Sequence, residues 1–163
     1  MREIIEILQA DGRATPERIA KMTGLGVEEV RDQIAAWEDA GIIRRYKAVV
    51  DLDRLRAIDG TEVITALIDV SVSPERGFGF DNEAARISQF PEVRSVYLMS
   101  GAQDLRCVVT GRSMHDVADF VAQKLATIDR VNATVTHFVL KTYKDDGELL
   151  IPPTEDHRLR VAP

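Results

Sequence analysis

Apolar residues in the first fifty positions recur at the three- and four-residue spacing of amphipathic helices. The pattern predicts helices over residues 1–10 and 27–40, with another between them that begins at Thr15-Pro16. A threonine N-cap followed by proline at the first helical position is a common helix start. The stretch 43–50 predicts a strand after the last of these helices. The apolar positions that define the helices are Ile4, Ile5, Ile7, Leu8, Ile19, Ala20, Met22, Val30, Ile34 and Trp37.

Beyond residue 60 the pattern becomes that of β-strands separated by helices. Residues 62–72 alternate with a period of two, and both faces of this stretch are largely apolar, which predicts a strand covered on both sides. Further predicted elements are a helix over 81–90, strands over 93–99 and 105–110, a helix that begins at Ser113, and a strand over 131–143. This β-α-β-β-α-β order is the ferredoxin-like arrangement.

The change of pattern near residue 50 predicts an α+β protein with two domains. We expect a helical domain over 1–50, a linker over 51–60, a ferredoxin-like domain over 61–148 and a C-terminal tail over 149–163. The formal net charge is −6, of which −1 falls in residues 1–50 and −5 in the remainder. This charge argues against a protein that wraps nucleic acid by bulk charge, but it is compatible with a local basic patch.

Three residues in the helical domain have the properties that a helix-turn-helix requires. Two helices that cross sharply need a small residue where they touch, a residue that tolerates positive φ in the turn, and an apolar residue where the second helix returns to the core. Ala20, Gly24 and Val30 supply these properties. The alternative is a three-helix bundle that has this spacing by chance, but the strand over 43–50 suits a wing. We therefore interpret residues 1–50 as a winged helix-turn-helix.

The remaining composition argues against several classes of protein and site. No run of about eighteen apolar residues is present, so no membrane span is expected, and the charged start of the chain does not resemble a signal peptide. The single cysteine, Cys107, predicts a packed thiol in a cytoplasmic protein without disulfides or a Cys-rich zinc site. His115, His137 and His157 lack metal-ligand spacing, and no nucleophile–base pair stands out. We therefore expect no catalytic residue, metal or cofactor.

Several short motifs together make the chain similar to the Lrp/AsnC family of bacterial and archaeal transcription regulators. The resemblance covers residues 1 to about 148. It is carried by Ile19-Ala20, Gly24-Leu25, Glu38–Ile43, Tyr46–Asp51, Phe90–Val93, Met99–Leu105 and Thr134–His137. The resemblance implies an N-terminal winged helix-turn-helix that binds double-stranded DNA, a linker strand, and a C-terminal domain that senses a ligand and dimerises. It also implies a response to amino acids and assembly into dimers, often joined into tetramers or octamers.

The third predicted helix departs from the family in its charge, because family recognition helices usually carry several arginines. Residues 27–39 contain five acidic residues and one base. Acids that face DNA repel phosphates unless they point away or accept from cytosine amino groups. Bases in the 43–50 strand can contact phosphates; the alternatives are a solvated face or salt bridges to the acids of the helix. The expected DNA-contacting residues are Lys21, Glu28, Glu29, Arg31, Asp32, Arg44, Arg45 and Lys47.

A glycine-containing loop between two predicted strands is the candidate effector site. Backbone N–H groups at Gly101 can hold the carboxylate of a free amino acid, and Asp104 can hold its ammonium. From spacing alone, an ordinary β-hairpin turn is the alternative. The family resemblance implies that this loop lines an effector pocket at the dimer interface, helped by hydroxyls of the last strand. The expected effector-binding residues are Ser100, Gly101, Ala102, Asp104, Thr134 and Thr136.

Two other functions are compatible with the sequence. Some proteins of this two-part architecture resemble siroheme decarboxylases, enzymes that need basic residues for the tetrapyrrole carboxylates and a histidine near the macrocycle. The histidines here are poorly placed for that role. The other function is an effector sensor whose DNA-binding helix has decayed, an alternative that the acids of residues 27–39 keep open.

Overall fold

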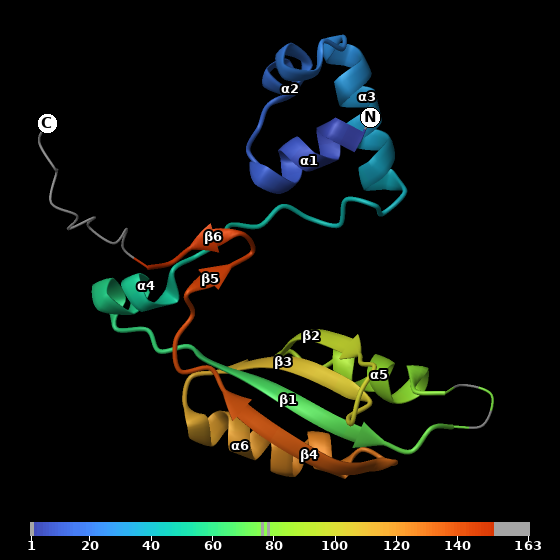
Figure 1. The fold of residues 1–163 in the computed structure, drawn as a ribbon, viewed down its shortest axis with the longest axis vertical. Helices are drawn as coiled ribbons and strands as arrows, with labels where there is room; N and C mark the ends of the chain where they lie inside the picture. The colour runs from blue at the N-terminus through green and yellow to red at the C-terminus, as the bar shows by residue number, and fades with distance from the viewer. Residues whose placement is uncertain (1, 76, 78, 152–163) are drawn as a thin grey trace, which may run out of the picture. The chain divides into compact units, whose positions relative to one another are not determined.

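The computed structural model describes residues 2–75, 77 and 79–151, and the chain forms two compact units, residues 1–50 and 51–163. Figure 1 shows the helices and strands of both units. Each unit has a hydrophobic core of its own. Within the described ranges, no helix is long and apolar enough to cross a membrane.

The first unit is built from α1 (Arg2–Ala10), α2 (Pro16–Thr23) and α3 (Val27–Asp39). As the N-cap of α2, the Thr15 hydroxyl accepts a hydrogen bond from the Arg18 N–H. Gly24 follows α2 with a φ of 76°, a left-handed conformation that glycine adopts without steric cost. The three predicted helices are confirmed, and their core contains two of the helix-turn-helix positions, Ala20 and Val30, while Gly24 lies in the exposed turn. The buried core residues are Ile4, Ala14, Ile19, Ala20 and Val30.

The segment after α3 forms no strand among the described residues, so the strand predicted over 43–50 is wrong. A strand requires an extended neighbour to bond with, and the rest of this unit is mainly helical. The segment is instead tied back to α3. The Ile43 N–H donates to the Trp37 carbonyl at 3.1 Å, and the Tyr46 hydroxyl donates to Glu38 Oε1 at 2.9 Å. Burial raises the pKa of Tyr46, and the hydrogen bond to Glu38 adds to this effect.

Residues 51–60, expected to be a linker, contain the helix α4 (Leu52–Asp59). Asp51 Oδ1 accepts from the Arg54 N–H at 3.1 Å as the N-cap, and Gly60 ends the helix with a φ of 71°. These local signals are present in the sequence. No residue of α4 is buried, so the helix has no apolar face packed on a core. The sequence therefore lacks the apolar periodicity from which a helix is predicted.

The second unit contains a four-stranded antiparallel sheet with the order β2-β3-β1-β4. Its strands are β1 (Ile64–Val72), β2 (Val93–Leu98), β3 (Leu105–Gly111) and β4 (Val131–Phe138). Its helices are α5 (Asp81–Ser88), α6 (Met114–Gln123) and the short 3₁₀ helix η1 (Leu125–Thr127). This element order confirms the predicted ferredoxin-like arrangement.

The central strand β1 presents different residues to the two faces of the sheet. Ala66, Ile68, Val70 and Val72 are buried in one core with residues of α5 and α6, so both helices lie on that face. The alternate residues of β1 point to the opposite face, as the two-residue periodicity predicts. We call this opposite face, which α5 and α6 leave uncovered, the open face. It is defined by Thr65, Leu67, Asp69 and Ser71 of β1 and by their partners in β3 and β4.

The last predicted strand is too long. β4 ends at Phe138, and a two-stranded hairpin of β5 (Lys144–Asp145) and β6 (Glu148–Leu149) follows. The hairpin turns at Asp146-Gly147, where both residues have positive φ, as a two-residue Asp-Gly turn requires. The hairpin therefore takes in the first residue of the predicted tail. The remainder of that tail beyond Ile151, including His157, lies outside the described residues.

Candidate nucleic-acid interface and effector loop

The solvent-facing side of α3 is acidic. Val30 is fully buried, and Ile34 and Trp37 pack against the same core, which fixes the opposite side of the helix toward water. That outer side carries small and acidic residues, all exposed. They are Glu28, Glu29, Asp32, Ala35, Ala36 and Asp39. The expected DNA-contacting acids of α3 thus share an exposed surface, whose negative charge repels the phosphates of DNA.

The one base of α3 is held by two carboxylates. Arg31 Nη2 donates to Glu17 Oε1 of α2 at 2.5 Å, and Arg31 Nη1 donates to Glu28 Oε1 at 2.8 Å. The pKa of Glu17 is lowered, first by a hydrogen bond from its own backbone N–H and then by hydrogen bonds from Thr15 and Arg31. Sequence spacing suggests the Glu28 contact, three residues away on one helix, whereas the Glu17 contact depends on how α2 and α3 pack.

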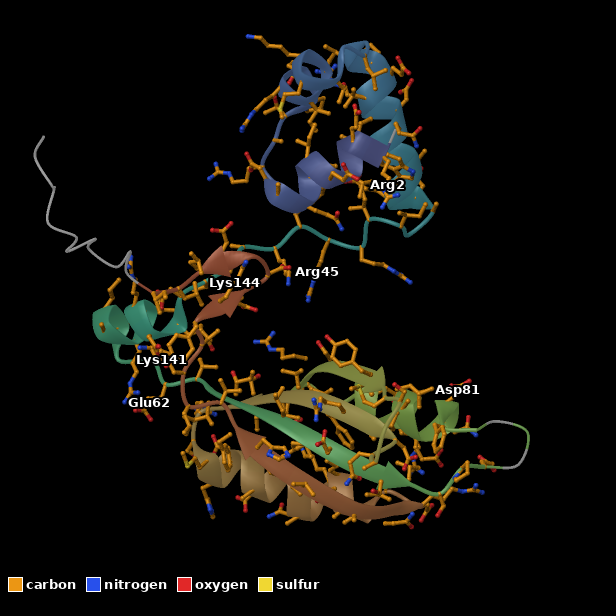
Figure 2. All side chains as sticks on the ribbon, in the orientation of Figure 1. Arg2, Arg45, Glu62, Asp81, Lys141 and Lys144 are labelled. Carbon is orange, nitrogen blue, oxygen red and sulfur yellow. The ribbon has the colours of Figure 1, made fainter. Side chains whose placement is uncertain are left out.

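Three of the bases predicted to contact DNA are exposed and form no ion pair within the described residues. Lys21, Arg44 and Arg45 form no ion pair within the described chain, so the alternative in which the two arginines pair with the acids of α3 is not realised. The Arg44 guanidinium lies beside Gly41, and Figure 2 shows the Arg45 side chain on the segment after α3. Lys47, also exposed, belongs to the same segment. Tyr46 anchors this segment through Glu38, which places its bases next to the end of α3.

The loop between β2 and β3 is anchored to the end of β1. Asp104 Oδ2 accepts a hydrogen bond from the Val72 N–H at 2.8 Å, and the Ser71 hydroxyl bonds to Gln103 Oε1. The Met99 N–H donates to the Asp104 carbonyl at 2.8 Å and closes the loop. One carboxylate oxygen of Asp104 is therefore used inside the chain. The predicted partners of an amino-acid effector remain exposed at the loop tip: Ser100, Gly101 and Ala102.

The structure does not bring the two predicted threonines together with this loop. In an antiparallel sheet, directly paired residues point to the same face. Thr134 pairs with Val70 and Thr136 with Ile68, so both hydroxyls belong to the face covered by α5 and α6. Ser71, which binds Gln103, belongs to the open face. A role for the threonines in the same pocket remains a prediction.

Sequence reasoning missed a charged cluster on the open face. Asp69 is only 8% exposed and receives two hydrogen bonds from Arg106, Nε to Oδ1 at 2.6 Å and Nη2 to Oδ2 at 2.9 Å. His137 Nε2 lies 3.5 Å from Asp69 Oδ2. The Arg106 hydrogen bonds hold the pKa of Asp69 below its ordinary value. The only sequence signal is a charge at an alternating position of a predicted strand, because the partners come from strands far along the chain.

The neighbouring Cys107 is a packed thiol, as predicted. It is fully buried, and burial raises its pKa to about 11, with a smaller contribution from the charge of Asp69. A thiol with this pKa is protonated at neutral pH and is a poor nucleophile or metal ligand. Within the described residues, no group of three or more His, Cys, Asp or Glu side chains could hold a metal ion.

A cavity of about 480 Å³ opens near the start of α6, where no functional residue was predicted. Charged residues lie at its wall, including Glu92 just before β2, Arg94 of β2 and Asp116 of α6. The Glu92 carboxylate is bonded to Lys124 Nζ at 2.5 Å, and this bond lowers the pKa of Glu92. The acid is thus neutralised within the chain.

Matches to known families connect both units to one class of protein. A family model described as the Lrp/AsnC ligand binding domain matches residues 65–149, and a winged helix-turn-helix DNA-binding model matches residues 1–44. The chain belongs to the Lrp/AsnC family. It is therefore a transcriptional regulator of the Lrp/AsnC type, with the α+β fold of that family.

Individual Lrp/AsnC proteins resemble the chain over nearly its whole length. The uncharacterized HTH-type transcriptional regulator YugG of Bacillus subtilis is 50% identical over 161 residues, which are 99% of this chain and 95% of that protein. The HTH-type transcriptional regulator LrpA of Pyrococcus horikoshii is 31% identical over 86% of this chain and 94% of its own. The crystal structure of the transcriptional regulator NMB0573 of Neisseria meningitidis, in complex with L-methionine, has a TM-score of 0.67 and 25% identity, and covers 88% of this chain and 89% of that one. The names of these relatives favour regulation over the decarboxylase alternative.

Proposed function

We propose that this regulator binds double-stranded DNA through residues 1–50 and a free amino acid through the loop Ser100–Asp104, and that it is a cytoplasmic protein without enzymatic activity. Family membership is the observation that carries the proposal. The L-methionine complex of NMB0573, whose chain is 25% identical to this one, supports an amino acid as the effector class. The exposed glycine of the loop and the remaining oxygen of Asp104 supply the two kinds of group that a zwitterion needs.

The open face of the sheet supports a dimer held by the second unit. Leu67 of β1 pairs with Val108 of β3, and Val135 of β4 is 44% exposed on the same face. A second copy that packs its own open face against this one would remove these apolar residues from water. An obligate interface of this kind buries ~2,000 Å² or more in total. Dimers joined into tetramers or octamers would then place several helix-turn-helix units on one DNA.

Calorimetric titration with each of the twenty amino acids, alanine, leucine and methionine among them, tests the effector site. We expect Asp104→Asn to weaken amino-acid binding about tenfold or more, because a charge-assisted hydrogen bond to the ammonium is lost. Asparagine keeps an oxygen for the Val72 N–H, so the loop anchor remains. Asp119→Asn on α6 removes the same charge away from the loop and serves as the control. Absence of heat for every amino acid, with an unchanged melting temperature, contradicts the proposed effector class.

Fluorescence anisotropy with the duplex upstream of the protein's own gene tests the DNA contacts. Changing Arg44 and Arg45 together to alanine should weaken binding to all sequences and reduce the slope of log affinity against log salt by about two. Arg54 and Arg56 of α4 provide the matched double alanine control, since each is ion-paired with a nearby acid. Equal affinity of the first double variant and wild type contradicts the phosphate-contact assignment.

The acidic outer side of α3 favours one second candidate, an effector sensor that no longer binds DNA. Both candidates predict that calorimetry detects amino-acid binding. Only the DNA-binding regulator predicts that anisotropy detects binding to the duplex. Amino-acid binding without any DNA binding at low salt supports the sensor. Salt-dependent DNA binding by wild type rejects it.

A further inference from the structure

The most unusual feature of the DNA-facing helix is that its single cation is already occupied. Both terminal nitrogens of Arg31 donate to carboxylates, Nη2 to Glu17 at 2.5 Å and Nη1 to Glu28 at 2.8 Å. An arginine that reads guanine uses two parallel N–H donors on the base edge, and one that binds a phosphate uses the same donors. The carboxylates therefore use one N–H of each terminal nitrogen, two of the five donors of Arg31, and compete with a nucleic acid for its charge.

We propose that Glu17 and Glu28 form a carboxylate clamp that holds Arg31 in the free protein and releases it only to a guanine edge or a phosphate. The inference rests on the DNA-binding function proposed above and names the residues that set its affinity and selectivity. A duplex that takes both terminal nitrogens of Arg31 competes with the two charge-assisted hydrogen bonds to Glu17 and Glu28. A partner with two acceptors, such as a guanine edge, competes for Arg31 better than a partner with one acceptor.

The exposure of the three side chains makes this exchange accessible. Arg31 is 49% exposed, Glu17 55% and Glu28 77%, so water reaches all of them. Exposed ion pairs change an equilibrium by only about twofold to fivefold. The clamp therefore reduces DNA affinity without abolishing it.

The two carboxylates come from different helices, which distinguishes the clamp from a simple pair within one helix. Glu28 precedes Arg31 by one turn of α3, whereas Glu17 lies in the first turn of α2. Hydrogen bonds from its own backbone N–H, from Thr15 and from Arg31 lower the pKa of Glu17, which favours its charged form. One of the two carboxylates that bind Arg31 of α3 therefore belongs to α2.

A matched control is available on the same helix. Glu29 lies in the first turn of α3 beside Glu28, and no hydrogen bond or ion pair joins it to another described residue. Glu29→Gln removes the same charge near DNA and leaves the clamp intact. Any excess effect of Glu17→Gln or Glu28→Gln over this control therefore reports on Arg31.

The experiment is a double-mutant cycle measured by fluorescence anisotropy on the full chain and the duplex upstream of its own gene, at two salt concentrations. Glu17→Gln and Glu28→Gln should each tighten binding about twofold to fivefold more than Glu29→Gln. In an Arg31→Gln background this excess should vanish, because the residue that the clamp holds is gone. A set of duplexes with single guanine replacements should show that the released variants discriminate less among sequences. Melting curves verify that each variant is folded.

The outcomes separate the clamp from the DNA-binding function. If wild type binds DNA and the three glutamate variants behave alike in both backgrounds, the clamp is wrong and the function stands. If Glu17→Gln and Glu28→Gln bind more tightly than Glu29→Gln in the wild-type background and no more tightly in the Arg31→Gln background, the clamp is supported. If no variant binds at low salt, both proposals fail.

Discussion

The two faces of the four-stranded sheet are built from alternate residues of the same strand, yet they have different chemistry. On the face covered by α5 and α6, Ala66, Ile68 and Val70 are fully buried among apolar side chains. On the open face, Leu67 is half-buried and Asp69 is paired with Arg106. Apolar burial is non-directional and stabilises the fold of one chain. A bidentate ion pair has a fixed geometry, so it contributes orientation more than net stability.

Neighbouring residues of β1 therefore serve different purposes, one set stabilising the fold of the chain and the other facing the proposed second copy. Truncation of apolar residues on the covered face should have the larger effect on the free energy of unfolding, whereas substitutions on the open face should have a smaller effect on unfolding and a larger one on association. The following predictions test this division, beginning with the largest expected effect.

Leu67→Asp should convert the proposed dimer to a monomer. It places an unpaired carboxylate on the open face, and burying such a charge costs several kcal/mol. Size exclusion with light scattering measures the change. Met114→Asp, a similar change at an exposed position of α6, should remain dimeric. A wild-type monomer at micromolar concentration contradicts the interface.

Ile68→Ala should lower the free energy of unfolding by about 2–5 kcal/mol, the usual cost of truncating a fully buried isoleucine. Urea denaturation at constant protein concentration measures this effect. The folded variant should keep the oligomeric state of wild type. A loss below about 1 kcal/mol would mean that the covered face is not the tightly packed core described above.

Asp69→Asn should have a smaller effect on unfolding, about 1–3 kcal/mol, because Arg106 loses a charged hydrogen-bond partner but retains a polar one. Asp119→Asn, whose partner His115 is exposed, should be close to neutral. An Asp69→Asn variant that is as stable as the Asp119→Asn control would show that the pair contributes only to association.

The same pair should make stability depend on acid pH. Arg106 lowers the pKa of Asp69 in the folded protein, so the stabilisation is complete above the ordinary aspartate pKa of about 4. It is lost as the pH falls through the lowered pKa of the folded state. Wild type should therefore lose more stability in acid than Asp69→Asn. Parallel pH curves for the two proteins would exclude this contribution.

The sequence by itself determined the elements whose signals are local. Periodicity of the apolar residues predicted α1 to α3 and the strands of the ferredoxin-like sheet, because core contact forces every buried side chain of an element onto one side. Gly24 marked the helix-turn-helix turn, since only a residue without a Cβ adopts its φ freely. The Ser100–Asp104 loop was found from its place between two strands.

Only the tertiary structure determined which residues from distant parts of the sequence contact each other. The register of β1 with β3 and β4 brings Arg106 and His137 to Asp69, and the same register turns Thr134 away from the open face. The packing of α2 on α3 brings Glu17 to Arg31. No other strand is present among residues 2–50, so the segment predicted as a strand over 43–50 has no extended neighbour there to pair with. Periodicity within one element says which side of it is buried, but it contains no information about which residue of another element lies opposite.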